Sequence, residues 1–215
     1  MDFIINILNL LKERSDFFIG LLVEHIIMSA EAAIIICIIG ITLGVFITRY
    51  KKIAKFVLTI TNFIYTVPSI ALFGFLVTIT GIGNTSALIA LVVYGLLPVI
   101  RNTYVGIIEV DYQIVESAIA MGSTDRQLLF KVQLPLALPV IMSGLRTMII
   151  MTIALGGIAS FIGAGGLGVA IWRGITTNFP EMTAAGSLLV ALLAISCDGM
   201  MGLIDKRIQI KIYKK

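Results

Sequence analysis

Long stretches without any charged side chain restrict the fold of this chain more than any other feature of its sequence. Asp, Glu, Lys and Arg are absent from four stretches, Ala32–Thr48, Phe56–Ile100, Thr147–Trp172 and Met182–Cys197. Only 13% of the 215 residues are charged and 59% are hydrophobic, whereas a soluble domain carries roughly 25% charged residues. Because a membrane-spanning helix needs about 20 mainly apolar residues, the sequence predicts an all-α, polytopic membrane protein.

The number of spans follows from the longest of these stretches. Phe56–Ile100 contains 45 residues, too many for one span, and the turn-forming segment Thr80–Ser86 divides it into two. The sequence therefore predicts about five transmembrane helices, near residues 22–47, 56–79, 86–108, 138–162 and 182–204. The blocks of alternating polar and apolar residues that an outer-membrane barrel needs are absent from the sequence.

The segments outside the spans complete the domain organisation. Residues 1–21 lack the basic start and small-residue cleavage site of a secretory signal, so we expect an amphipathic helix at the outer surface there. Residues 22–205 are expected to form a single transmembrane domain, and residues 206–215 a basic cytoplasmic tail. Cys37 and Cys197 fall inside separate predicted spans, where packing is their expected role.

Positive charges are distributed unequally between the two sides of these spans. Twelve Lys and Arg residues fall on one side, and they are Arg49, Lys51, Lys52, Lys55, Arg101, Arg126, Lys131, Lys206, Arg207, Lys211, Lys214 and Lys215. Three fall on the other side, and they are Lys12, Arg14 and Arg173. Since Lys and Arg accumulate at cytoplasmic loops, the amino end is predicted outside and the carboxyl end inside. The net charge of +4 then requires no nucleic-acid partner.

The polar insert 109–137, between the third and fourth predicted spans, carries helix signals of its own. Val115–Met121 is a short helix-prone stretch, and Gly122 can adopt the positive φ that ends a helix. Thr124 and Gln127 have the spacing of a capping box, which predicts the start of a second helix.

The second helix of the insert is predicted to be amphipathic. Asp125 in its first turn favours the positive end of the helix dipole. Apolar residues follow at helical spacing, at positions Leu128, Leu129 and Val132. Pro135 and Pro139 then lead the chain into the next span. From the residues alone, the insert is either a solvated connection or a compact helical hairpin that a partner could contact.

The same insert resembles the EAA motif of the membrane subunits of ATP-binding-cassette importers. The resemblance rests on Glu116-Ser117-Ala118, on Gly122 three residues later, and on Val132-Gln133-Leu134-Pro135 after nine more. The motif has Ala where Ser117 stands, a change between small residues. The resemblance implies the type I importer (MetI-like) permease fold, in which this loop forms a coupling helix that docks on a separate ATPase.

Further implications concern partners and cofactors. The chain would be a transport subunit and not an enzyme, binding no cofactor or metal itself, while ATP and Mg are used by the partner ATPase. Its other implied partners are an extracytoplasmic substrate-binding protein, a second permease copy or paralogue, and the lipid of a bacterial plasma membrane. The implied ATPase-coupling residues are Glu116, Ser117, Ala118, Gly122, Asp125, Arg126, Leu134 and Pro135.

Other segments look like the permeases that import glycine betaine, carnitine or choline. These segments are Tyr65–Leu72, Gly81-Ile82-Gly83, Tyr94–Tyr104 and Phe161–Gly168. Methionine importers share much of the last segment, so a methionine or other amino-acid permease is an alternative. An ion-coupled secondary transporter is a second alternative, for which coupling carboxylates and repeated halves are typical. Five polar or aromatic residues are expected to line the path, Tyr65, Ser69, Tyr94, Asn102 and Tyr104.

Ionisable residues at membrane depth are functional candidates because charge in lipid is costly. Glu31 is expected in the outer part of the first span, where it either attracts a cationic ligand or faces a neighbouring helix. Arg146 and Asp198 are expected in the inner parts of the last two spans, where they pair with each other or with polar residues. His25 is expected at the outer interface.

Gly40 and Gly44 in the first predicted span have the spacing that permits close helix approach.

Nucleotide binding by the chain itself is not expected. Gly163, Gly165 and Gly168 match the spacing of the dinucleotide fingerprint, but that fingerprint requires a surrounding βαβ unit. Here the glycines follow an apolar span, so a tight external loop is the preferred interpretation. The sequence contains no phosphate-binding loop of the form G-x-x-x-x-G-K-[ST].

Overall fold

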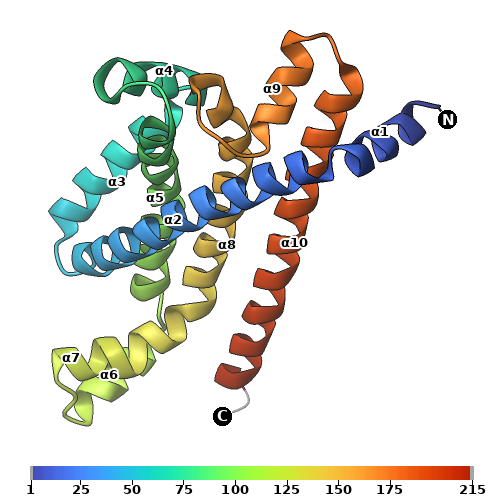
Figure 1. The fold of residues 1–215 in the computed structure, drawn as a ribbon. Coiled ribbons are helices and arrows are strands. Elements are labelled where there is room, and N and C mark those ends of the chain that lie inside the picture. Colours follow the sequence, from blue (N-terminus) through green and yellow to red (C-terminus); the bar gives the residue numbers. More distant parts are fainter. Residues whose placement is uncertain (1, 214–215) are drawn as a thin grey trace.

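The computed structural model describes residues 2–213, which form helices joined by short turns, without a strand (Figure 1). The all-α prediction is therefore confirmed. The α-helices are α1 (Asp2–Glu13), α2 (Ser15–Ile47), α3 (Lys51–Thr66), α4 (Ser69–Thr80), α5 (Asn84–Ile108), α6 (Tyr112–Ala120), α7 (Asp125–Gln127), α8 (Leu134–Ala159), α9 (Gly168–Thr176) and α10 (Pro180–Tyr213). A π-helical segment, η1, covers Leu128–Gln133, and a 3-10 turn, η2, covers Ser160–Ile162.

Within the described residues, four long helical stretches are apolar enough to cross a membrane. They are α2, α5, the continuous stretch Asp125–Ile162 that contains α8, and α10. A fifth crossing is made only if α3 and α4 are taken together as one bent span. The structure thus agrees with about five spans. It also moves two boundaries, since α2 begins at Ser15, before the predicted span, and α10 continues to Tyr213, through most of the expected tail. Lys214 and Lys215 lie outside the described residues.

The span expected over 56–79 is not a single straight helix. The chain turns by 98° between α3 and α4. Pro68 causes the break, because it cannot continue the helical hydrogen bonds and it pushes the preceding residue into extended backbone. Val67 accordingly has φ −68° and ψ 129°. Its carbonyl accepts a hydrogen bond from the Tyr94 hydroxyl of α5, which fixes the break to the centre of the molecule.

Helix α5 is the central helix and contacts α2, α3, α4 and α8 (Figure 1). The core around it is built from small and aliphatic side chains such as Ala87, Ala90 and Leu91. Close approach of α2 to α5 depends on Gly40 and Gly44. A Cβ at Gly44 would lie 2.6 Å from the Thr103 Cβ. The sequence prediction of close packing at this glycine pair is confirmed.

Helix α10 is held mainly by α8 and α9 and leaves large apolar side chains exposed. Ile195 is 68% exposed and Leu203 is 64% exposed. Such a continuous apolar face is unusual on a soluble monomer and is expected where lipid or another membrane subunit covers it. The α10 surface therefore supports the multi-pass membrane assignment.

Candidate functional site

The polar insert forms a helical hairpin that projects from one end of the molecule, below α5 and α8 in Figure 1. We call residues 111–133 the hairpin. It consists of α6, a turn at Gly122, α7 and η1. Asp111 caps α6, accepting a hydrogen bond from the Gln113 amide at 2.8 Å. The predicted short helix is present, and it begins at Tyr112, three residues before its expected start.

The turn between the two arms has the predicted geometry. Gly122 adopts φ +84°. Its amide donates to the Ile119 carbonyl at 2.9 Å, and the Ser123 amide donates to the Ala118 carbonyl at 3.1 Å. These two bonds close the C-terminal end of α6, as a left-handed residue after a helix commonly does.

The second arm begins with the predicted capping box. The Thr124 amide donates to Gln127 Oε1 at 2.9 Å, and the Gln127 amide donates to Thr124 Oγ1 at 3.4 Å. Both arms of the hairpin therefore start on side-chain caps encoded in the local sequence. The hairpin does not depend on burial of its tip to form these turns.

A π-helical segment joins the second arm to α8. The Leu134 amide donates to the Leu129 carbonyl, five residues earlier. Pro135 and Pro139 lack an amide donor and lie in the first turns of α8, so regular α-helical bonding is interrupted there. They do not turn the chain between two elements, because Asp125–Ile162 continues as one helical stretch. Single π-turns of this kind are frequent at functional sites.

The apolar residues of the hairpin divide into a packed set and an exposed set. Leu129 is buried against Ile107 of α5 and Ile141 of α8, so this side of the hairpin is attached to the body. The exposed set could not be distinguished in the sequence, and its most exposed members are Tyr112 (72% exposed), Ile119 (56%), Met121 (81%) and Phe130 (64%). Large apolar side chains exposed on a polar projection indicate a contact surface.

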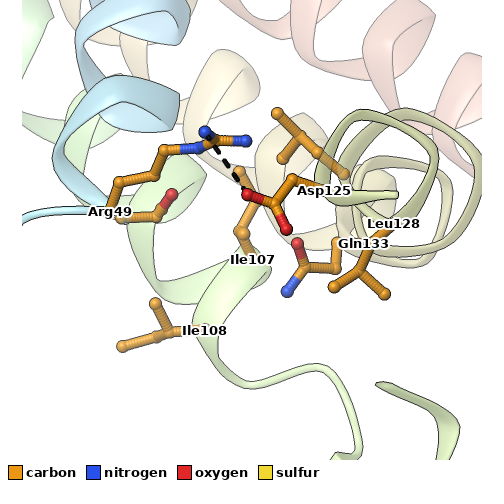
Figure 2. A pocket seen from close by; sticks show the side chains of 8 residues that line it. Arg49, Ile107, Ile108, Asp125, Leu128 and Gln133 are labelled. Carbon is orange, nitrogen blue, oxygen red and sulfur yellow. Dashed lines mark ion pairs between the residues drawn. The ribbon is translucent and has the colours of Figure 1, made fainter. Parts of the chain in front are cut away.

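A cavity of about 400 Å³ lies between the hairpin and the body. Its walls are Thr48, Arg49, Ile107, Ile108, Asp125, Leu128, Leu129 and Gln133. Figure 2 shows the Arg49 guanidinium directed at the Asp125 carboxylate, with a nitrogen–oxygen distance of 3.9 Å. Both side chains are largely exposed, so this ion pair contributes roughly 0–1 kcal/mol. The sequence indicated Asp125 but gave no signal for Arg49 beyond its positive charge.

The other predicted coupling residues lie on the hairpin or at its junction with α8. Glu116, Ser117 and Arg126 are exposed, whereas Ala118 is buried under the turn. The Ser117 hydroxyl donates to the Gln113 carbonyl at 2.7 Å. Leu134 and Pro135 are half-buried at the start of α8. The motif residues are thus grouped in space, although their role in coupling remains a prediction.

Arg146 of α8 and Asp198 of α10 form a two-pronged ion pair. Arg146 Nη2 donates to Asp198 Oδ2 at 2.6 Å, and Arg146 Nε donates to Asp198 Oδ1. Of the two arrangements considered for these residues, the structure shows direct pairing. Glu31 is exposed and lines an open cavity of about 360 Å³ together with Glu24 and Asn84.

The five residues expected to line the path do not all converge. Tyr65 and Tyr94 lie edge to face, with ring centroids 6.1 Å apart, at the break between α3 and α4. Asn102 faces α8, where a Cβ on Gly144 would lie 2.7 Å from the Asn102 Cβ. Tyr104 packs toward α3, and Ser69 is half-buried as the first residue of α4. Their lining role remains a prediction.

His25, which the sequence places at the outer interface, lies inside the protein in the structure. The side chain is fully buried, and its Nε2 lies 3.1 Å from the Ile153 carbonyl oxygen of α8. The Leu167 amide donates to His25 Nδ1 at 3.3 Å. Burial became possible because Gly156 and Gly166 leave room for the ring, each with a Cβ position about 3 Å from it. Spacing in the sequence does not reveal that these two glycines meet His25.

The chain is similar to known proteins in both sequence and fold. Residues 38–210 match the family described as "Binding-protein-dependent transport system inner membrane component". The glycine betaine/carnitine/choline transport system permease protein OpuCD of Bacillus subtilis (strain 168) is 42% identical over 184 residues, which cover 85% of this chain and 80% of that protein. The ergothioneine transport permease/ergothioneine binding protein EgtU of Helicobacter pylori (strain G27) is 41% identical over 169 residues, covering 79% of this chain and 31% of that protein.

Among solved structures, an inward-facing MetNI methionine ABC transporter has a similar fold. The TM-score is 0.76 at 24% identity, with 86% of this chain and 93% of that chain covered. At this level of identity the likeness concerns the fold alone. It supports the predicted permease architecture.

Proposed function

Because this chain belongs to the family of binding-protein-dependent transport system inner membrane components, we propose that it is the permease subunit of an ATP-driven importer for quaternary ammonium osmolytes. The observation that carries the coupling part of this proposal is the hairpin. It has its own caps, projects from the body and exposes Tyr112, Met121 and Phe130 at its surface. A surface of that kind suits a protein partner, and a separate ATPase is the partner we propose.

The substrate class is inferred from relatives that are about equally similar to this chain. Their names specify glycine betaine, carnitine, choline and ergothioneine. All four compounds carry a trimethylammonium group, which aromatic side chains attract through cation–π interactions. We propose that a separate substrate-binding protein supplies most of the affinity through such contacts. Residues Tyr65, Ser69, Tyr94, Asn102 and Tyr104 would then contribute a weak lining to the path.

The proposed assembly contains two permease subunits, identical or related, and two ATPases. ATP and Mg would be used by the ATPases, and the hairpin with Glu116, Asp125 and Arg126 would transmit their closure. We place the hairpin on the cytoplasmic side and the amino end outside, since twelve basic residues against three favour that orientation. The assembly would act in the plasma membrane of a bacterium.

Uptake in a reconstituted system tests this proposal. The permease, its ATPase and its binding protein are placed in proteoliposomes and supplied with radiolabelled glycine betaine, carnitine, choline, ergothioneine or methionine. We expect ATP-dependent uptake of at least one trimethylammonium compound and none of methionine. Uptake of methionine alone would place the chain among amino-acid permeases, and uptake driven by an ion gradient without ATP would contradict the importer assignment.

A matched pair of charge reversals tests the role of the hairpin in the same system. Glu116→Lys changes the exposed surface of α6, whereas Glu13→Lys changes an exposed acid on α1. We expect Glu116→Lys to reach the membrane normally but to lose most uptake and most ATPase stimulation, and Glu13→Lys to behave as wild type. Equal uptake by both variants would mean that the hairpin does not couple ATP hydrolysis to transport.

A further inference from the structure

Three consecutive backbone amides in the segment Gly163–Gly168 are held by three side chains from other helices. The Gly165 amide donates to Asn84 Oδ1 at 3.1 Å. The Gly166 amide donates to Glu24 Oε2 at 3.0 Å, and the Leu167 amide donates to His25 Nδ1 at 3.3 Å. Glu24 and His25 belong to α2, and Asn84 is the first residue of α5. We call this segment the glycine loop.

The histidine contact requires one particular protonation state. A backbone amide can only donate, so Nδ1 must accept from Leu167 and carry no proton. The Ile153 carbonyl can only accept, so the proton must be on Nε2, which lies 3.1 Å away. Neutral His25 of α2 therefore makes two links through one ring. Its Nδ1 binds the glycine loop, and its Nε2 binds α8.

The glycine loop also fits closely against these side chains. Gly166 has φ +88°, and a Cβ there would lie 3.0 Å from His25 Nδ1. A Cβ on Gly165 would lie 2.5 Å from Glu24 Oε2. Within the loop, Leu167 is fully buried in a cluster with Phe18, Leu21 and Met182. The loop is thus seated by three hydrogen bonds and one buried anchor side chain.

The position of the glycine loop connects it with the hairpin. The continuous helical stretch Asp125–Ile162 begins in the hairpin and ends directly before Gly163, at the opposite end of the molecule (Figure 1). A displacement of the hairpin can therefore reach the glycine loop along one continuous helical stretch. The three amide contacts join this end of the stretch to α2 and α5, so such a movement acts on them.

We propose that Glu24, His25 and Asn84 are positioning residues that form a latch on the glycine loop, and that this latch opens once in each transport cycle. Seated, the loop closes the end of the permease opposite the hairpin. Released, it exposes Leu167 and opens that end. This inference rests on the proposed transport function, since it assigns the latch to the transport cycle.

Thiol labelling of the buried anchor measures latch opening directly. The native Cys37 and Cys197 are replaced by Ala, and Leu167→Cys is introduced as the reporter. Ile82→Cys serves as the reference reporter, because Ile82 is 79% exposed near the same loop. In membranes containing the complete transporter, a membrane-impermeant maleimide should label position 82 in all conditions. It should label position 167 only slowly at rest and faster once ATP is added.

Two substitutions of His25 separate a latch from a merely structural contact. Asn places an acceptor near the position of Nδ1 and keeps the bond to Leu167, whereas Gln places a donor near Nε2 and keeps the bond to Ile153. We expect His25→Gln and Asn84→Ala each to raise resting labelling of Leu167→Cys roughly five- to tenfold, the factor that one lost hydrogen bond predicts. His25→Asn should stay close to the parent, with labelling at Ile82→Cys unchanged in every variant.

The outcomes decide between the alternatives without knowledge of the substrate. Labelling at position 167 that is raised by His25→Gln and by ATP supports the latch. Labelling that ATP leaves unchanged overturns the proposal, because the loop would then be a static seal. Equal labelling in His25→Asn and His25→Gln overturns the assigned contact. If uptake of every trimethylammonium compound fails while ATP still raises labelling, the substrate proposal is wrong and the latch stands.

Discussion

Arg146 and Asp198 are the residues whose chemistry differs most from their surroundings. They lie on α8 and α10, and two hydrogen bonds pair the guanidinium with the carboxylate. Gly202 of α10 lies beside the guanidinium, whose Nη1 is 3.7 Å from the Cβ position of that glycine. Charge at membrane depth is costly unless it is paired, so each residue depends on the other.

We expect Arg146→Leu to lower the melting temperature and the membrane yield of the purified permease, because it leaves the Asp198 carboxylate without its partner. Arg146→Leu combined with Asp198→Leu should regain most of the lost stability, since it removes both charges. Melting is followed by tryptophan fluorescence of Trp172 in lipid nanodiscs. A double variant that is less stable than both single variants would contradict a paired, mainly structural role.

At the scale of elements, α2 and α5 pack closely against each other in the core. Gly44 allows this approach, since a Cβ there would also lie 3.1 Å from the Ile100 carbonyl oxygen. Gly20 lies on the same helix and has no atom within 4 Å of its Cβ position. Substitution of Gly44 therefore tests helix packing, whereas substitution of Gly20 tests only intrinsic helix preference.

Gly44→Ala should destabilise the permease by about 1–3 kcal/mol, the usual cost of overpacking a core. Gly20→Ala should be neutral or stabilising by up to about 1 kcal/mol, because Ala favours helix more than Gly does. Thermal unfolding of both variants in nanodiscs measures the difference. Equal stabilities would show that α2 and α5 separate without cost.

In the hairpin, the positive φ of Gly122 can be tested by substitution. Nothing lies within 4 Å of its Cβ position, so a substitution acts through the positive φ and not through a clash within the chain. Asn tolerates this backbone region, whereas a β-branched residue does not. Gly122→Val should lose most ATP-driven uptake at normal membrane levels, while Gly122→Asn retains most of it. Normal uptake by the Val variant would mean that the turn is not needed for coupling.

At the scale of the whole molecule, the hairpin and the glycine loop lie at opposite ends of the helical body (Figure 1). The charge distribution predicts that these ends face opposite sides of the membrane. The ion pair of Arg49 with Asp125 and the basic residues nearby belong to the hairpin end.

Impermeant thiol labelling in intact cells tests this orientation, after Cys37 and Cys197 are replaced by Ala. A cysteine at the exposed Ile82 should be labelled in intact cells, and one at the exposed Lys206 only after permeabilisation. Both outcomes follow from an amino end outside and a carboxyl end inside. The reverse pattern would place the hairpin outside and remove it from any cytoplasmic ATPase.

Local signals in the sequence were sufficient for several parts of this protein. Charge-free stretches determine the helical membrane class, because uncharged runs of that length are stable only in lipid or in a core. The caps of the hairpin were also readable, since Thr124 and Gln127 contact each other across three residues and Gly122 needs no distant partner. Pro68 carried a local signal for the break between α3 and α4, which hydropathy alone conceals.

Contacts between distant segments were decided only by the tertiary structure. His25 meets Leu167 and Ile153 across more than a hundred residues of chain, and Arg49 meets Asp125 across a cavity. Likewise, packing determines which apolar residues of the hairpin are buried, so Leu129 faces the body while Met121 remains exposed. A sequence specifies its own turns and periods within a few residues, but the partner of a side chain depends on how the helices pack.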